Sequence, residues 1–327
     1  MKNKIHYANI DVIRIFAASS VVVFHVGQML QSRGMNIEKL AGVQAFFSSG
    51  VYLFFVISGF VISTSIFATE TKSLFGFYKS RIKRIVPLYA FLTTLTFLIF
   101  NSSAILGYSE IQFSVEELIK SLFFVTELSN SSPPIVQQGW TLEFEMAFYL
   151  IIGFSLFLKN HRISLIASIV VLCFVSAVIG NTLFLLFAIG MILSFIVKNF
   201  RTNSFWIGVV GVAIFTTVAT SVVCNVISMS PFSYGLFYSV IIFCSVNVKQ
   251  LESILVITLG QISYATYLIQ GIIIGAIYQI IPNLSIFRFS IYSIISSCVL
   301  ITCILSGYVL NKFIEKPVSG KMRTYGW

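Results

Sequence analysis

An arginine and a histidine stand inside the first long apolar stretch of this chain, where a lipid-facing helix is expected to carry neither. Arg14 and His25 are eleven residues apart, so on a helix their side chains lie within about 20° of one another and about 16 Å apart along the axis. Asp11 falls on the same face. Ionisable groups inside a membrane are costly unless they face protein, water or a ligand, which favours a functional site. The alternative is packing, in which Asp11 pairs with Arg14 and His25 bonds a neighbouring helix.

A second candidate site is a run of four cations within six residues, Lys79, Arg81, Lys83 and Arg84. On a helix Arg81 and Arg84 are about one turn apart, so two guanidiniums can hold the same phosphate-bearing ligand. The run is equally compatible with a topology signal that contacts anionic lipid headgroups.

Two acids beside aromatic residues form the third candidate site. Glu143 and Glu145 enter an apolar stretch two residues apart, so they point about 160° away from one another and cannot both face one cavity. One is expected to be a site residue, whereas the helix dipole alone can account for an acid near an N-terminus. Trp140 and Tyr149 suit a sugar ring, although aromatic residues are also common at membrane interfaces.

The composition places all these residues in a membrane protein. The 327 residues are 57% hydrophobic and 10% charged, and the mean hydropathy is +0.95, which excludes a soluble globular protein. We expect a single all-α unit over residues 1–327, with no fused soluble domain and an uncleaved first span, because Asp11 and Arg14 interrupt the apolar run. The five cysteines have no paired or metal-like spacing, so neither disulfide nor metal site is predicted.

The apolar stretches predict about ten membrane spans with both termini in the cytoplasm. If the N-terminus is inside, 16 of the 21 basic residues fall in inside segments and only Arg33, Lys39, Lys120 and Arg288 fall outside. That bias follows the positive-inside rule and explains the net charge of +10 without nucleic acid. The predicted spans are 9–30, 46–68, 85–106, 139–158, 163–180, 182–198, 205–224, 233–248, 259–281 and 289–311.

The longest external connection, 107–138, is acidic and contains a further helix signal. Ser114 followed by Glu117 makes a capping box, and apolar residues recur at helical spacing after it. We therefore expect a short helix that lies on or dips into the membrane.

Taken together, the motifs resemble the acyltransferase-3 family of integral membrane O-acyltransferases, which modify bacterial surface and exported polysaccharides. The resemblance covers nearly the whole chain, and its six parts occur in order. They are the Asp11–His25 stretch, Gly50–Phe60, Arg81–Tyr89, Trp140–Tyr149, Ile262–Leu268 and the terminal Glu315-Lys316-Pro317.

The resemblance implies that Arg14 and His25 are the essential pair of the first span and that Glu145 is the family's acid. It also implies that Arg81 and Arg84 lie beside an acyl-coenzyme A donor. Two positions depart from the family pattern. Tyr52 replaces an acid, and Gln270, which cannot titrate, replaces a histidine.

From these observations we expect an O-acyltransferase of the bacterial inner membrane, most simply an O-acetyltransferase with no permanently bound cofactor. Cytoplasmic acetyl-coenzyme A would be the donor, held by Arg14, Arg81 and Arg84, and the acceptor would be a hydroxyl of a polysaccharide or lipid-linked glycan. His25 would act as general base or carry the acyl group covalently, two mechanisms that the sequence does not separate. Glu145, on the outer side, would orient the acceptor or His25. The competing class is a glycolipid transporter or flippase that uses the Arg14–His25 stripe as a coupling path.

Overall fold

The computed structural model describes residues 7–68, 74–105, 111–127, 129, 132–158, 160–281 and 289–319. In these ranges the chain is helical and contains no strand. The helices are α1 Ala8–Ser32, α2 Ala41–Ser48, α3 Gly50–Ala68, α4 Leu74–Ile105, α5 Val115–Leu122, α6 Gly139–Ser155, α7 His161–Ile179, α8 Leu183–Phe200, α9 Phe205–Val223, α10 Pro231–Val246, α11 Ile254–Ile280, α12 Phe289–Leu310 and α13 Lys316–Ser319. Short 3-10 turns cover Glu38–Leu40 and Leu156–Leu158, and a π-helical turn covers Asn311–Glu315.

Nine helical stretches in the described ranges are long and apolar enough to cross a membrane. The sequence predicts about ten, and the difference is α10. That helix has 16 residues, which gives about 24 Å, less than the roughly 30 Å of a hydrocarbon core. It begins at Pro231, with Ser230 as its N-cap, and its C-cap is Asn247. The all-helical membrane fold is confirmed, and α10 is shorter than the other predicted spans. Its end returns to the start of α9, because the Ser204 backbone N–H donates to the Asn247 carbonyl oxygen at 2.9 Å.

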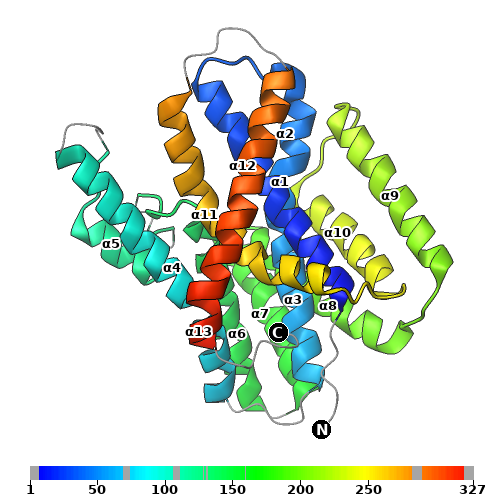
Figure 1. The fold of residues 1–327 in the computed structure, drawn as a ribbon. Helices are drawn as coiled ribbons and strands as arrows, with labels where there is room; N and C mark the ends of the chain where they lie inside the picture. Colours follow the sequence, from blue (N-terminus) through cyan, green and yellow to red (C-terminus); the bar gives the residue numbers. More distant parts are fainter. Residues whose placement is uncertain are drawn as a thin grey trace.

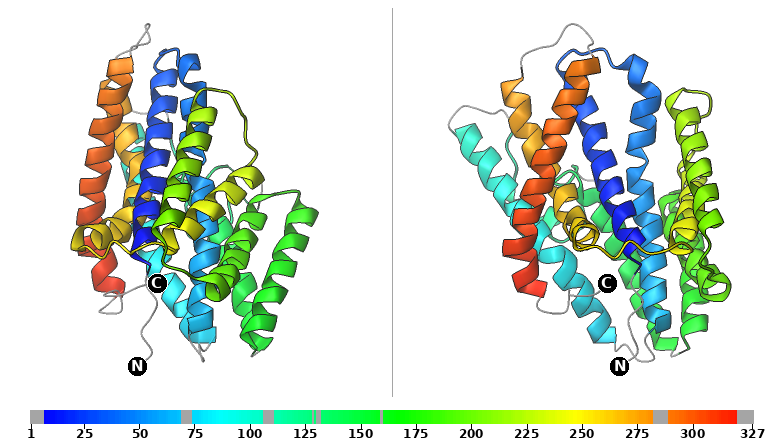
Figure 2. Two further views of the ribbon diagram at one scale, coloured as in Figure 1. Left: turned by 90° about the vertical axis from the view of Figure 1, so that its right-hand side faces the viewer. Right: turned by 45° about the vertical axis from the view of Figure 1, so that its right-hand side comes forward.

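Figures 1 and 2 show an elongated bundle in which α1 begins and α13 ends toward the same end. We call this the inner end, and the opposite end, where α1 ends and α12 begins, the outer end. This arrangement agrees with termini on one side of the membrane. Which side is cytoplasmic remains a prediction, and several of the charges behind it, Lys2, Lys4, Lys72, Lys159, Arg288, Lys321 and Arg323, lie outside the described residues.

Helices α3 and α8 approach one another closely because each presents a glycine to the backbone of the other. A Cβ on Gly59 would lie 2.1 Å from the Phe187 carbonyl oxygen, and one on Gly190 would lie 2.1 Å from the Val56 carbonyl oxygen. Contacts of this kind let membrane helices pack backbone to backbone. They fix α3, which lines the candidate site, against the rest of the bundle.

Helix α11 runs beside α1 and joins it to the inner half of the bundle. Its first turns lie across the bundle, and its later turns rise between α1, α12 and α4 (Figure 1). The Arg14 Nη1 atom donates a hydrogen bond of 3.2 Å to the Gly260 carbonyl oxygen. A Cβ on Gly260 would also meet the Asp11 side chain at 2.2 Å. The charged start of α1 is therefore seated against the α11 backbone.

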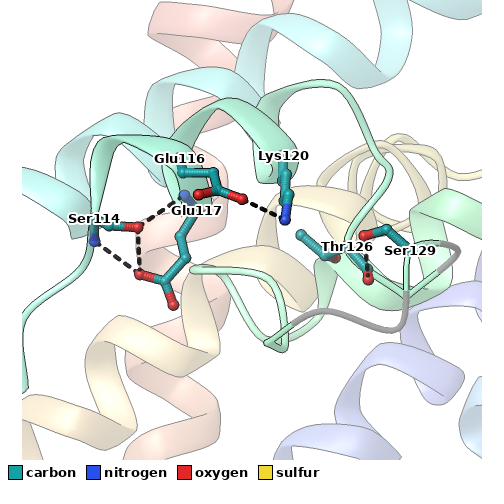
Figure 3. A network of polar contacts seen from close by, with 6 residues as sticks. All are labelled: Ser114, Glu116, Glu117, Lys120, Thr126 and Ser129. Carbon is teal, nitrogen blue, oxygen red and sulfur yellow. Dashed lines mark hydrogen bonds and ion pairs between the residues drawn. The ribbon is translucent and has the colours of Figure 1, made fainter.

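The segment between α4 and α6 contains the predicted short helix, now observed as α5. Ser114 caps it, since its backbone N–H donates to Glu117 at 2.8 Å and its hydroxyl accepts from the Glu117 N–H at 3.1 Å. Lys120 pairs with Glu116 at 2.6 Å on the exposed side of the helix (Figure 3). The apolar face of α5 is exposed, with Val115 at 64% and Phe123, just after it, at 73%, as expected for a helix that meets lipid.

Candidate active site

A cavity between α1, α3, α4, α6 and α11 brings the candidate residues of three separate sequence motifs together. It encloses about 720 Å³ of empty space, counting the part that opens to solvent. Its charged lining residues are Arg14, Arg81, Arg84 and Glu145. Three guanidiniums face a single carboxylate among the described lining residues, so the cavity carries an excess of positive charge and suits an anionic ligand.

The three arginines reach this cavity from two helices, α1 and α4. Arg81 is 4% exposed, and its Nε atom has no hydrogen-bond partner among the described residues. Its guanidinium lies 5.8 Å from the Phe77 ring and 5.9 Å from the Tyr149 ring. Lys79 and Lys83, from the same basic run, are exposed. The period of the helix thus separates the run into two arginines that line the cavity and two lysines that face outward.

Glu145 lines the cavity and accepts hydrogen bonds from two hydroxyl groups. The Ser58 Oγ atom donates to Glu145 Oε1 at 3.0 Å, and the Tyr149 hydroxyl, one turn further along α6, donates to the same oxygen. We expected Glu145 near the outer side, beside His25 or an acceptor. The structure instead places it in the same cavity as the arginines. Helical spacing predicts the direction of a side chain about its own helix but not which helices enclose it.

Glu143 points elsewhere, as its spacing from Glu145 predicts. It is 1% exposed and accepts hydrogen bonds from the Thr126 hydroxyl, from the Thr126 backbone N–H at 2.9 Å and from the Glu127 backbone N–H at 2.9 Å. Glu143 therefore anchors the segment after α5 to the start of α6, a structural task.

His25, Asp11 and Trp140 are not among the residues that line this cavity. His25 is half-buried, and its Nδ1 atom lies 2.9 Å from Gln28 Oε1. Asp11 is packed against Gly260. Trp140 packs in an aromatic cluster, with its ring 6.3 Å from Phe55 and 6.0 Å from Phe144. The predicted Arg14–His25 stripe is thus divided, with Arg14 in the cavity and His25 beyond it.

Four hydroxyl residues line the cavity without having been assigned a role from the sequence. Two of them form a pair, Thr141 and Tyr267, whose hydroxyl oxygens are 3.0 Å apart. Tyr264 donates to the Ile85 carbonyl oxygen at 2.9 Å and so joins α11 to α4. The fourth is Ser58. All four lie within the sequence motifs that carry the family resemblance. Their place in those motifs was the signal from which the sequence could have indicated them as site residues.

Comparison with known proteins gives a match along most of the chain. A family model described as "Acyltransferase domain" aligns with residues 7–309. This chain belongs to the acyltransferase-3 family. The match includes α1 to α11, all of α12 except its last residue, and every residue of the cavity, so membership rests on the membrane bundle itself.

Curated proteins similar to this acyltransferase-3 chain include two with informative names. The exopolysaccharide production protein ExoZ of Rhizobium meliloti is 35% identical over 127 residues, which are 37% of this chain and 38% of ExoZ. The O-acetyltransferase OatA of Staphylococcus aureus is 26% identical over 170 residues, 47% of this chain and 25% of OatA. The aligned part is thus well under half of either relative. No solved structure gives a significant match.

The two departures from the acyltransferase-3 pattern lie outside the cavity lining. Tyr52 is half-buried and packs on Tyr234 with the ring centroids 5.8 Å apart. Gln270 is fully buried, and its Nε2 atom donates to the Tyr267 carbonyl oxygen at 2.9 Å. Within the described ranges, no three His, Cys, Asp or Glu side chains gather as metal ligands do.

Proposed function

We propose that this protein is an O-acetyltransferase that moves an acetyl group from cytoplasmic acetyl-coenzyme A to a hydroxyl of a polysaccharide or lipid-linked glycan. The observation that carries the proposal is the convergence of Arg14, Arg81 and Arg84 on one cavity. Family membership supports acyl transfer in a membrane, and the names of ExoZ and OatA favour an acetyl group and an exported glycan.

The phosphates of the donor would supply negative charge, which balances the excess of positive charge from the three arginines of the cavity. Burying Arg81 without a full set of hydrogen-bond partners is costly, and phosphate oxygens are matched acceptors for a guanidinium. With the phosphates at Arg81 and Arg84, the uncharged pantetheine arm extends past Arg14 toward the outer end, so no charge crosses the membrane. The inner end of the bundle is then the cytoplasmic end, and the membrane is the bacterial inner membrane.

His25 is proposed to act on the acetyl group beyond the cavity. As a general base it would accept the proton of the acceptor hydroxyl while that oxygen attacks the thioester carbon and the coenzyme A thiolate leaves. As a covalent carrier it would first take the acetyl group itself and release the same thiolate. Both routes need an imidazole nitrogen that is not occupied by Gln28.

The test uses the full chain in lipid nanodiscs with radiolabelled acetyl-coenzyme A and a crude glycolipid fraction. Release of free thiol together with label in the glycolipid fraction supports the proposal. Movement of glycolipid across the bilayer without thiol release would instead indicate a transporter.

A further inference from the structure

The donor cavity is closed on its outer side by three side chains. Helix α6 runs toward the inner end and α11 toward the outer end, so the outermost cavity residue on each is Thr141 and Tyr267 (Figure 1). Their hydroxyl oxygens are 3.0 Å apart. The Tyr267 ring also meets the edge of the Phe54 ring on α3, with the ring centroids 5.3 Å apart. We call Phe54, Thr141 and Tyr267 the outer wall of the cavity.

The outer wall is backed by buried side chains. Thr141 donates to the Gln138 carbonyl oxygen at 2.9 Å, and the Gln270 amide donates to the Tyr267 carbonyl oxygen at 2.9 Å. Thr141 and Tyr267 are 7% and 5% exposed, and Gln138 and Gln270 are 3% and 0% exposed. No described lining residue of α6 or α11 lies further out. The cavity therefore ends at the outer wall in this conformation, and His25 does not line it.

The donor has to part the outer wall if His25 is to act on the acetyl group. The Tyr264 hydroxyl donates to the Ile85 carbonyl oxygen, which joins α11 to α4 one residue after Arg84. From Tyr264 to Tyr267 the helix rises only about 5 Å. An extended pantetheine arm is much longer than that. With the phosphates at Arg84, the arm therefore crosses the level of the wall and carries the thioester beyond it.

The outer wall consists of side chains that can turn. One neutral hydrogen bond and one ring contact join its three members, and each is a modest interaction. When the Tyr267 ring turns aside, its hydroxyl loses Thr141 as a partner but can donate to a carbonyl oxygen of the pantetheine arm. The Thr141 hydroxyl keeps the Gln138 carbonyl oxygen as its acceptor. Opening the wall thus leaves no hydroxyl without a partner.

We propose that Phe54, Thr141 and Tyr267 form a gate that selects the acyl group of the donor by its width. An unbranched acyl group is no wider than the pantetheine arm that follows it, so it passes where the arm passes. A branched acyl group of the same length is wider by one methyl group. It has to push the Phe54 or Tyr267 ring further into packed neighbours, which is costly. The gate rests on the proposed acyl transfer and adds a donor specificity to it.

Propionyl- and isobutyryl-coenzyme A test the gate, because the two acyl groups have the same length and differ by one branching methyl group. Thiol release is measured with each donor on the full chain in lipid nanodiscs. Wild type should favour the propionyl donor in kcat/KM by at least about tenfold, the discrimination that one such group gives. Phe54→Ala should lower this ratio at least about fivefold through faster turnover of the isobutyryl donor. Misfolding does not produce such a gain.

Val61→Ala is the matched control for Phe54→Ala. Val61 lies on α3 seven residues after Phe54, on the same face of the helix, and it also lines the cavity. It is about two turns away from the outer wall, toward the inner end, so Val61→Ala should keep the wild-type ratio. If Phe54→Ala does not fold, Phe54→Leu takes its place and should shift the ratio in the same direction by a smaller factor.

An unchanged ratio in a folded Phe54 variant overturns the gate, and so does a wild type that uses the two donors equally. If wild type turns over neither donor, binding decides. S-propyl- and S-isobutyl-coenzyme A, which carry no acyl group to transfer, compete with radiolabelled coenzyme A, and Phe54→Ala should lower the preference for the straight-chain compound. An unchanged preference overturns the gate. Failure to turn over acetyl-coenzyme A refutes the proposed function instead, and the binding comparison still decides the gate.

Discussion

The Ser58 hydroxyl on α3 donates a 3.0 Å hydrogen bond to the Glu145 carboxylate on α6. Both residues line the cavity with the three arginines, so this bond sets the position of its only described carboxylate. We predict that Ser58→Ala lowers kcat about tenfold and leaves the KM for acetyl-coenzyme A unchanged, since hydrogen bonds to charged groups contribute about 1.5–3 kcal/mol.

Ser63→Ala is the matched control for Ser58→Ala. Ser63 lies on the same helix and is fully buried, but its hydroxyl has no partner among the described residues. It should leave kcat unchanged. In a Glu145→Gln background, Ser58→Ala should have little further effect, because residues that act through one contact are not additive. Full additivity would mean that Ser58 acts independently of Glu145.

The basic run offers a charge-matched comparison for donor binding. Arg81→Gln with Arg84→Gln should raise the KM for acetyl-coenzyme A at least tenfold with a much smaller change in kcat, because phosphate contacts remote from the thioester contribute uniform binding. Lys79→Gln with Lys83→Gln also removes two positive charges, but from exposed positions. If both double variants raise KM equally, the run contributes only to topology or to lipid contact.

Loss of the imidazole is expected to remove acyl transfer. His25→Ala should accumulate normally and lose at least about 10²-fold in turnover, the contribution of a general base. Gln28→Leu should cause a smaller loss, because it keeps the imidazole and removes only the contact of Gln28 with its Nδ1 atom. Normal turnover by His25→Ala in nanodiscs would assign the histidine to packing.

The two acids of α6 are predicted to affect different properties. Glu143→Gln weakens the bonds to Thr126 and Glu127, so it should lower the free energy of unfolding by about 1–3 kcal/mol and leave turnover per folded molecule near wild type. Glu145→Gln should lower turnover per folded molecule and leave the free energy of unfolding near wild type. Thermal unfolding in detergent and thiol release measure the two properties, and an exchange of the two outcomes would refute the assignment.

The cap of α5 is predicted to weaken in acid. The pKa of Glu117 is held below its ordinary value chiefly by the Ser114 backbone N–H, and further by the hydroxyls of Ser132 and Ser114. A lowered pKa in the folded state contributes stability above the ordinary carboxyl pKa, and this stability is lost as the pH falls through the lower folded value. Amide exchange in residues 115–122, corrected for the intrinsic rate, should rise below about pH 4. Ser114→Ala should show fast exchange already at neutral pH.

The helices were predictable because apolar run length and cap residues are local signals. The separation of Glu143 from Glu145 also follows from local helical geometry. The meeting of Arg14 with Arg81, Arg84 and Glu145 does not, because it depends on which helices pack together over more than a hundred residues of chain. The same limit explains the placement of Glu145 near the arginines and of Trp140 in an aromatic cluster. The role of Ser58 becomes visible only when α3 and α6 are side by side.

The spacing between the donor-side arginines is set by a helix that carries none of them. Arg14 bonds to α11 at Gly260, and four residues later Tyr264 of α11 bonds to the backbone of α4 at Ile85, one residue after Arg84. Helix α11 therefore links α1 and α4, the two helices that carry the arginines. A small shift of α11 along its axis, or a small rotation about it, would change the distance between the guanidinium on α1 and those on α4.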